Sequence, residues 1–186
     1  MMKKEILIKY IKIDDKIKGI RTKLNEEAIG RYIEKYESGN TKPILVKEID
    51  RQNFILIDGH HRVEACNRSK KQKIDAEVID IEDKDIFSKA VECNQEHGVR
   101  LTESEEEDII IELFEQGKTQ EEMGKVFHVS QGAISQRINN NKRLKLLVTN
   151  KTNTSTINEI LSGKKQSEVA NNYDITQGRV AQIWGD

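Results

Sequence analysis

The sequence predicts an α+β domain, a small mixed sheet with helices, followed by an all-α helix-turn-helix domain. Three observations support this prediction. Over residues 1–92, short apolar runs with the alternation of strands are mixed with segments of helical spacing. From Thr102, the predicted cap of the first helix with Glu105 at the capping-box position, the spacing of apolar residues is helical throughout. The same second half contains an internal repeat with an offset of 46 residues.

The first 92 residues predict strands and helices in alternation. Five short apolar segments are predicted strands, the first two with an entry segment as the alternative: 6–8, 11–13, 44–46, 54–57 and 76–79. Three segments with helical spacing are predicted helices: 24–36, 61–67 and 83–93. Gly39 supplies a stop to the first of these helices. The polar turn 50–53 lies between two strands that we expect to form a hairpin.

The internal repeat predicts two helix-turn-helix units. The aligned segments are 117–124 with 163–170, and 127–136 with 173–182. Each copy has a helix, a tight turn and a second helix, which Ser130 or Thr176 caps. A small residue, Gly124 or Ala170, lets the two helices approach each other. The expected domains are 1–92 (nucleotide or phosphate binding), 93–101 (hinge and pocket closure), 102–150 (helix-turn-helix) and 151–186 (second repeat).

Exposed positions around the second helix of each unit are candidate DNA contacts. In such units Gln can pair with adenine and Arg with guanine in the major groove. The candidates are Ser130, Gln131, Ala133, Ser135, Gln136, Arg137, Lys142, Arg143, Gln177, Arg179 and Gln182. From Lys118 to Lys151, seven Lys or Arg face two acidic residues, which favours a phosphate backbone. The alternative is a pair of helical hairpins that contact protein.

Composition narrows the class of protein. Charged residues make up 34% of the chain and the mean hydropathy is -0.70, as is typical of a soluble, helix-rich protein. The longest apolar stretches are far too short to span a bilayer, so we expect no membrane partner. The only cysteines, Cys66 and Cys93, form no disulfide framework or metal-binding spacing. A cytoplasmic localisation is therefore expected.

The segment 55–65 carries the most informative motif of the chain. An apolar run ends at Asp58 and Gly59, and two His and an Arg follow where a helix begins. A glycine lets the backbone approach a ligand, and the free N–H groups of a helix start favour an anion. His61 and Arg62 add polar or charged donors. The alternative is a strand-to-helix turn with a solvated basic cap.

The order of these segments resembles the N-terminal domain of the ParB/sulfiredoxin superfamily. In that superfamily a Pro-Ile-x-Val strand, here 43–46, is followed by a hairpin that ends in a Gly-x-x-Arg phosphate loop, here 59–62. The Asp-Gly-x-His-Arg form at 58–62 and the Asn-x-x-His-Gly-x-x-Leu-Thr form at 94–102 resemble a ParB-like regulator branch. They differ from the chromosome-partition type, which has Gly-Glu-Arg-Arg. The resemblance covers about residues 5 to 145.

The resemblance implies a nucleotide site and a candidate cofactor. In that superfamily the phosphate loop holds nucleotide phosphates. A segment equivalent to residues 94–101 of this chain closes over them, often with a metal ion. The implied binding residues are Arg21, Asp58, Gly59, His60, His61, Arg62, Asn94 and His97. Asp58 could position a metal or a ring nitrogen, or equally bond its own backbone. A nucleoside triphosphate with Mg²⁺ is the candidate cofactor, and no catalytic residue is assigned.

The residues of this chain match the other activities of the superfamily less well than they match nucleotide binding. Sulfiredoxins carry their reactive Cys where this chain has His60, so that redox chemistry should be absent. A branch that phosphorylates free serine carries a catalytic Glu near the position of Arg21, and Glu26 and Glu27 lie on a predicted helix start. The His residues lack partners at zinc spacing, so no metal site of the protein itself is expected.

The predicted function is sequence-specific binding of double-stranded DNA, in transcriptional regulation or plasmid or phage partition. Nucleotide is the candidate switch, and a homodimer is expected. Any enzymatic activity is at most a slow NTPase. The alternative function is a small-molecule kinase, of the free-serine type, or an NTPase.

Overall fold

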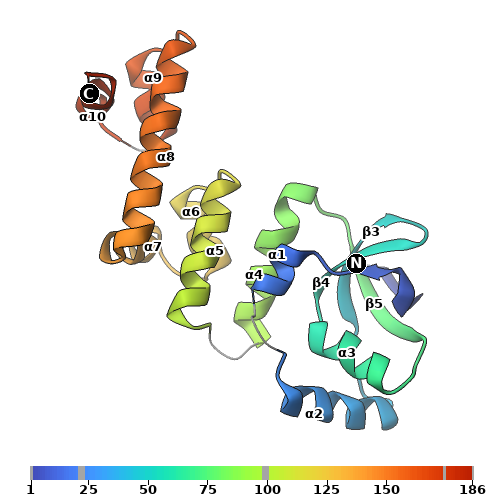
Figure 1. Ribbon diagram of the computed structural model, residues 1–186. Coiled ribbons are helices and arrows are strands. Elements are labelled where there is room, and N and C mark those ends of the chain that lie inside the picture. Colours follow the sequence, from blue (N-terminus) through green and yellow to red (C-terminus); the bar gives the residue numbers. More distant parts are fainter. Residues whose placement is uncertain (1, 21–23, 98–100, 174, 186) are drawn as a thin grey trace. The chain divides into compact units, whose positions relative to one another are not determined.

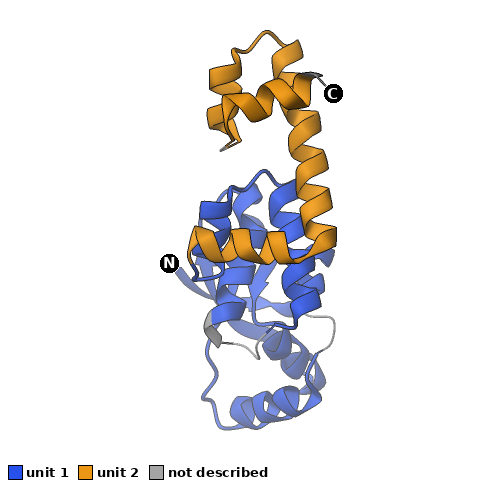
Figure 2. Ribbon diagram, turned by 90° about the vertical axis from the view of Figure 1, so that its left-hand side faces the viewer, with its two compact units in different colours: residues 1–129 blue, residues 130–186 orange. Residues whose placement is uncertain are grey.

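The computed structural model describes residues 2–20, 24–97, 101–173 and 175–185. The chain divides into two compact units, residues 1–129 and residues 130–186 (Figure 2). Each unit is described by itself. No helix in the described part of the chain has both the length and the apolar character needed to cross a bilayer.

Five strands of the first unit form one mixed sheet (Figure 1). They are β1 (Met2–Leu7), β2 (Ile11–Lys12), β3 (Ile44–Asp50), β4 (Asn53–Asp58) and β5 (Lys73–Ile79). Their order is β1-β5-β3-β4-β2. β3 and β4 form the expected antiparallel hairpin, whereas β3–β5 and β2–β4 are parallel pairs. The predicted mixed sheet is confirmed.

Helices bury both faces of this sheet. Those of the first unit are α1 (Asp15–Gly19), α2 (Glu26–Glu37), α3 (His60–Arg68), α4 (Ile86–His97), α5 (Glu103–Glu115) and α6 (Gln120–Val126). Successive strand residues point to opposite faces, and Leu56 and Ile57 of β4 are both buried. α2 and α3 share a core with Leu56 that includes Ile29 and Cys66, and α4 contacts β4. Cys66 is thus a small residue of this core.

Several short elements were not predicted from the sequence. Helix α1 and the 3-10 turn η1 (Ile8–Tyr10) lie between longer elements, and a second 3-10 turn, η2 (Asp83–Asp85), takes the first three residues of the predicted helix 83–93. Ion pairs join α1 and η2 to the helical segment that follows the sheet: Lys16 Nζ lies 2.6 Å from Glu112 Oε1, and Lys118 Nζ lies 2.5 Å from Asp85 Oδ1. α5 and α6 therefore belong to the same compact unit as the sheet. The predicted boundaries around residues 92 and 101 stay a prediction.

The second unit is entirely helical in its described residues. It contains α7 (Gln131–Asn140), α8 (Lys142–Leu161), α9 (Gln166–Asn172) and α10 (Gln177–Gly185). α8 runs for 20 residues because it has neither Pro nor Gly and because the Asn141 side chain caps its first turn. The cap that the sequence predicts at Thr102 is present in full, with a reciprocal bond from Glu105.

Candidate functional site

The turn from β4 to α3 accepts only glycine at position 59. Gly59 has φ 116° and ψ 25°, a left-handed conformation that side chains disfavour. A Cβ atom there would lie 2.6 Å from Cγ2 of the buried Ile44. The Gly59 carbonyl accepts a hydrogen bond from Val63 N–H at 2.9 Å, which closes the first turn of α3. This tight turn brings the start of α3 against β3.

Arg62 joins that helix start to both strands of the hairpin. Its side chain is 10% exposed. Nη2 donates to Asp58 Oδ2 at 2.5 Å, and Nη1 donates to the Pro43 carbonyl. Asp58 thus accepts from Arg62, a partner that neither of its sequence-based interpretations included. Arg62 lines the cavity described below and also holds its wall in place.

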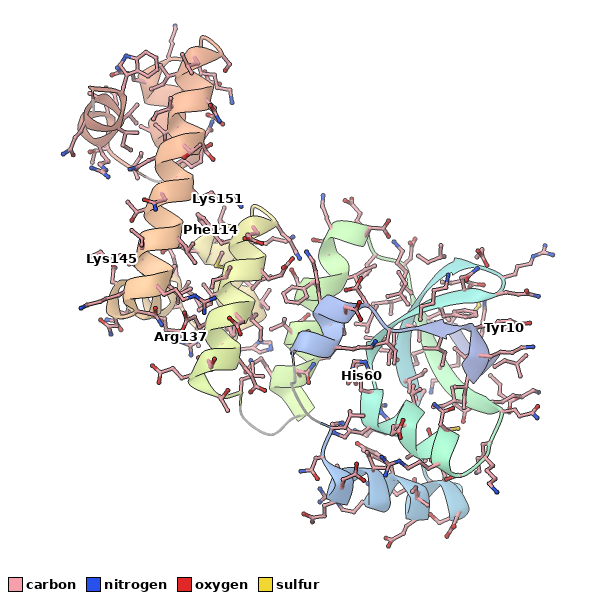
Figure 3. The ribbon with its side chains drawn as sticks, viewed as in Figure 1. Tyr10, His60, Phe114, Arg137, Lys145 and Lys151 are labelled. Atoms are coloured by element: carbon pink, nitrogen blue, oxygen red, sulfur yellow. The ribbon has the colours of Figure 1, made fainter. Side chains whose placement is uncertain are left out.

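The two histidines of the motif have different environments. His61 Nε2 accepts a hydrogen bond from Asn25 N–H at 3.0 Å, which places an unprotonated ring nitrogen at the start of α2. His60 Nε2 is buried and has no hydrogen-bond partner among the described residues. Burial lowers the pKa of His60, and His61 and Lys18 lower it further, whereas the Asp58 carboxylate opposes them. His60 is therefore a neutral ring beside the cavity (Figure 3).

A cavity of about 1000 Å³ lies in the first unit, at the start of α3. Besides the motif, its lining includes four lysines from α1, α2, β3's entry and α4: Lys18, Lys35, Lys42 and Lys89. The acidic residues in the lining are Asp58, which pairs with Arg62, and Glu77. A cavity of this size accommodates a nucleotide-sized molecule. Lys18 and Lys89 also pair with Asp15 and Glu92, at 3.1 and 2.7 Å, so the surplus of cations that favours an anion in the cavity is modest.

The structure brings most of the predicted ligand-binding residues together. Positions 58–62 and Asn94 all line the cavity, and Asn94 Nδ2 donates to the Ala90 carbonyl. Arg21 and the His97 side chain lie outside the described residues. Among the described residues, no group of three His, Cys, Asp or Glu could hold a metal ion. Sequence reasoning missed the four lysines, because single lysines on separate elements carry no local motif.

The helical repeat of the sequence is also present in three dimensions. In the first copy, Val129 N–H donates to the Gly124 carbonyl at 2.9 Å, and Ser130 accepts from Ala133 N–H as the cap of α7. In the second copy, Ile175 N–H donates to the Ala170 carbonyl at 3.0 Å. The boundary between the two compact units falls between α6 and α7, so the second copy alone lies within one unit.

Most predicted DNA-contact residues are accessible in the structure. The exposed ones are Ser130, Gln131, Gln136, Lys142, Arg143, Gln177 and Gln182. The half-buried ones are Ala133, Ser135, Arg137 and Arg179. Arg179 Nη1 donates to Gln182 Oε1 at 2.8 Å, and Nη2 donates to Asn153 Oδ1 at 3.4 Å. These bonds fix the Arg179 side chain along α10 and α8.

An acid-free stretch covers α7 and most of α8. Residues 123–158 contain six Lys or Arg and no Asp or Glu. Figure 3 shows Arg137 on α7, and Lys145 and Lys151 on α8. Over residues 123–158 the local charge is positive, which favours a polyanion.

The fold and the site together define a class: a mixed-sheet domain with a lysine-lined cavity, followed by helix-turn-helix repeats. The model of the ParB N-terminal domain family matches residues 4–95, and the model of sigma-70, region 4 matches residues 100–140. Residues 4–95 thus form a ParB-type N-terminal domain. The predicted family and fold class are confirmed.

Solved structures similar to this chain include ParB proteins and a sulfiredoxin. C-terminally truncated ParB from Caulobacter crescentus, complexed to the centromeric parS site, is 14% identical, with a TM-score of 0.55. That likeness covers 98% of this chain and 97% of the other. The structure of the same protein complexed with CTP-gamma-S is 16% identical, with a TM-score of 0.45, and the likeness covers 74% of this chain and 77% of the other. Sulfiredoxin from Arabidopsis thaliana is 20% identical, with a TM-score of 0.37, and the likeness covers 44% of this chain and 88% of the other. No curated protein sequence matches the chain.

Proposed function

We propose that this ParB-like protein binds specific sequences in double-stranded DNA and that a nucleoside triphosphate, with Mg²⁺, binds in its lysine-lined cavity. The role would be transcriptional regulation or plasmid or phage partition, with the nucleotide as switch and a homodimer as the binding form. The DNA part and the nucleotide part rest on separate observations. Each therefore has its own test.

The acid-free stretch 123–158 carries the DNA proposal. Lys142 and Arg143 are exposed at the start of α8, where they would neutralise phosphates without distinguishing bases. Gln136 is exposed on α7, the helix that would enter the major groove. The parS complex of the C. crescentus protein, which shares this fold, supports the same kind of partner.

The first prediction separates phosphate contacts from base contacts. Lys142→Ala or Arg143→Ala should weaken binding to all duplexes and lower the slope of log affinity against log salt by about 0.9 for each cation removed. Gln136→Ala should cost about 1–3 kcal/mol at the preferred site alone. Salt-titrated binding of the full chain to selected and random duplexes measures both effects. If the full chain shows no salt-sensitive duplex binding, the DNA proposal is wrong.

The cavity carries the nucleotide proposal. Four lysines line it, and so do the first residues of α3, where a helix start favours an anion. His60 Nε2 offers a buried nitrogen without a partner in the described part of the chain, which a phosphate oxygen would satisfy. The pKa of His60 is lowered without ligand, and a bound polyphosphate would raise it by favouring the charged ring.

The second prediction is that nucleotide binding takes up a proton at His60. Since the ring is neutral without ligand and charged beside phosphate, affinity should rise as pH falls from about 8 towards about 6. Calorimetry with the four NTPs and Mg²⁺, in buffers of different ionisation enthalpy, measures this uptake. His60→Gln controls for protonation of the nucleotide itself and should bind with little pH dependence beyond it. Absence of binding by every NTP would overturn the nucleotide proposal.

The stability of the ligand-free protein should depend on pH in the opposite direction to its nucleotide affinity. The lowered pKa of His60 means that the unfolded chain binds the proton first as pH falls. The neutral His60 ring therefore contributes to the stability of the free protein only above about pH 6.5, the ordinary His pKa, and this contribution is lost as the pH falls below that value. The nucleotide-bound protein, in which the ring is charged, should show no such loss.

A nucleotide switch requires coupling between the two ligands. Asn94 lies on α4, seven residues before the described chain resumes at Leu101, and Thr102 caps α5 directly after it. Residues 98–100, within the predicted hinge segment 93–101, lie outside the described residues. If coupling exists, nucleotide changes DNA affinity and DNA changes nucleotide affinity by the same factor. Equal DNA affinity with and without saturating nucleotide would leave this segment a passive linker.

The kinase alternative has no comparable support in the structure. Glu26 pairs with Arg68 of α3 at 2.6 Å, and neither Glu26 nor Glu27 lines the cavity. The cavity-lining carboxylates of the described residues are Asp58 and Glu77, and Arg62 already holds Asp58. We therefore propose a binding protein.

A further inference from the structure

The helix bounds of the structure repeat with the offset of the sequence. α6 begins at Gln120 and α9 at Gln166, while α7 begins at Gln131 and α10 at Gln177. α5 ends at residue 115 and α8 at residue 161. Each pair differs by 46 residues. The last part of α8, residues 149–161, therefore corresponds to α5, and the chain contains two complete three-helix modules.

The turns of the two modules repeat in detail. Gly117 and Gly163 both end a helix with positive φ, at 80° and 90°. Their N–H groups donate to the Phe114 and Ile160 carbonyls, at 3.0 and 2.9 Å. Thr176 accepts from Arg179 N–H at 3.1 Å and so caps α10 as Ser130 caps α7. The second module thus has the backbone geometry of a helix-turn-helix, so the repeat is present in the structure as well as in the sequence.

The outer faces of α7 and α10 also correspond. The first six positions share the sequence Gln-Gly-x-x-x-Gln, and both glutamines are exposed in each helix: Gln131 and Gln136, Gln177 and Gln182. The inward position is buried in both, as Ile134 and Val180. Glutamine pairs with adenine through two hydrogen bonds in the major groove. Two helices that present the same glutamines from the same caps would prefer related base sequences.

One helix joins these two faces within a single compact unit. α7 contacts the beginning of α8, whereas α9 and α10 pack at its other end (Figure 1). The bond from Arg179 to Asn153 attaches α10 to α8. A helix of 20 residues is about 30 Å long, close to one turn of B-DNA at about 34–36 Å. The N-terminal part of α8 adds cations between the two modules.

We propose that one chain binds a bipartite DNA site, in which α7 contacts one element and α10 contacts a second, related element about one helical turn away. This inference rests on the proposed DNA binding and adds to it a second sequence-specific contact surface.

A matched pair of variants tests the second contact. Gln136→Ala and Gln182→Ala change corresponding, exposed positions, and Gln177→Ala serves as a second variant of α10, since Gln182 also accepts from Arg179. Preferred sites of the full-length wild type are first selected from random duplexes. Each variant is then measured against every base substitution in those sites. Gln136→Ala should relax specificity in one element, and Gln182→Ala and Gln177→Ala in the other, each with a loss of about tenfold.

Changing the spacing provides the independent readout. Inserting five base pairs between the elements should lower wild-type affinity at least as far as Gln182→Ala does. The same insertion should weaken a Gln177→Ala/Gln182→Ala double variant much less, because that variant has already lost both α10 glutamines. The inference is overturned if both α10 variants keep wild-type affinity and base preference while Gln136→Ala loses them. If the wild type itself has no sequence preference, the proposed function fails instead, so the two failures are distinct.

Discussion

Replacing Gly59 by Ala is expected to lower the free energy of unfolding by roughly 2–5 kcal/mol, the sum of backbone strain and overpacking. The φ of 116° places the new side chain in the left-handed region. Its Cβ would also lie 2.6 Å from Cγ2 of Ile44, which is fully buried on β3 and has no room to move. Urea denaturation of the two proteins measures the difference.

The chain contains a matched control for this change. Gly117 also has a positive φ, 80°, but a Cβ atom there would meet nothing within 4 Å. Gly117→Ala should therefore show the backbone cost alone, about 1–2 kcal/mol. Equal losses of unfolding free energy at Gly59 and Gly117 would mean that the contact with Ile44 adds no cost, because the turn can relax.

Arg62→Ala should have the second large effect, a loss of about 3 kcal/mol, as expected when one partner of a largely buried ion pair is removed. The change leaves the Asp58 carboxylate, which is 25% exposed, without its guanidinium and leaves the Pro43 carbonyl without a donor. Nucleotide-induced stabilisation should vanish as well, because the wall of the cavity is lost. Thermal unfolding with and without NTP and Mg²⁺ measures both losses.

A double-mutant cycle separates the ion pair from the other contacts of Arg62. Asp58→Asn removes the charge of the partner and keeps its shape. If the pair dominates, Arg62→Ala should cost clearly less in the Asp58→Asn background than in the wild type. Additive losses would instead assign the effect to packing and to the Pro43 carbonyl.

The sequence predicts those elements whose cause is local. The caps at Thr102, Ser130 and Thr176 are correct, because a cap needs only a side-chain oxygen two or three residues from the N–H groups that it accepts from. The β3–β4 hairpin is correct for a similar reason, since a short polar turn joins two apolar runs. Local signals thus predicted most of the fold.

Features that depend on distant residues were not predictable. The four cavity lysines come from elements up to 71 positions apart, from Lys18 to Lys89, and only the folded sheet brings them to one cavity. The partner of Arg62 across the hairpin, the Pro43 carbonyl, has no sequence signature at all. Helix α8 was also missed as one element, because its mixed polar face gives little periodicity.

Arg62 and Gly59 also have a consequence for how such a protein diverges. Both residues serve the fold and the cavity at once, so a substitution that removes either one is selected against for folding alone. The Gly-x-x-Arg motif would then persist even in descendants that no longer bind a ligand. By contrast, Lys35 and Lys42 are exposed at the rim and can be exchanged at little structural cost. New ligand preferences would arise at the rim of the cavity, while its floor stays the same.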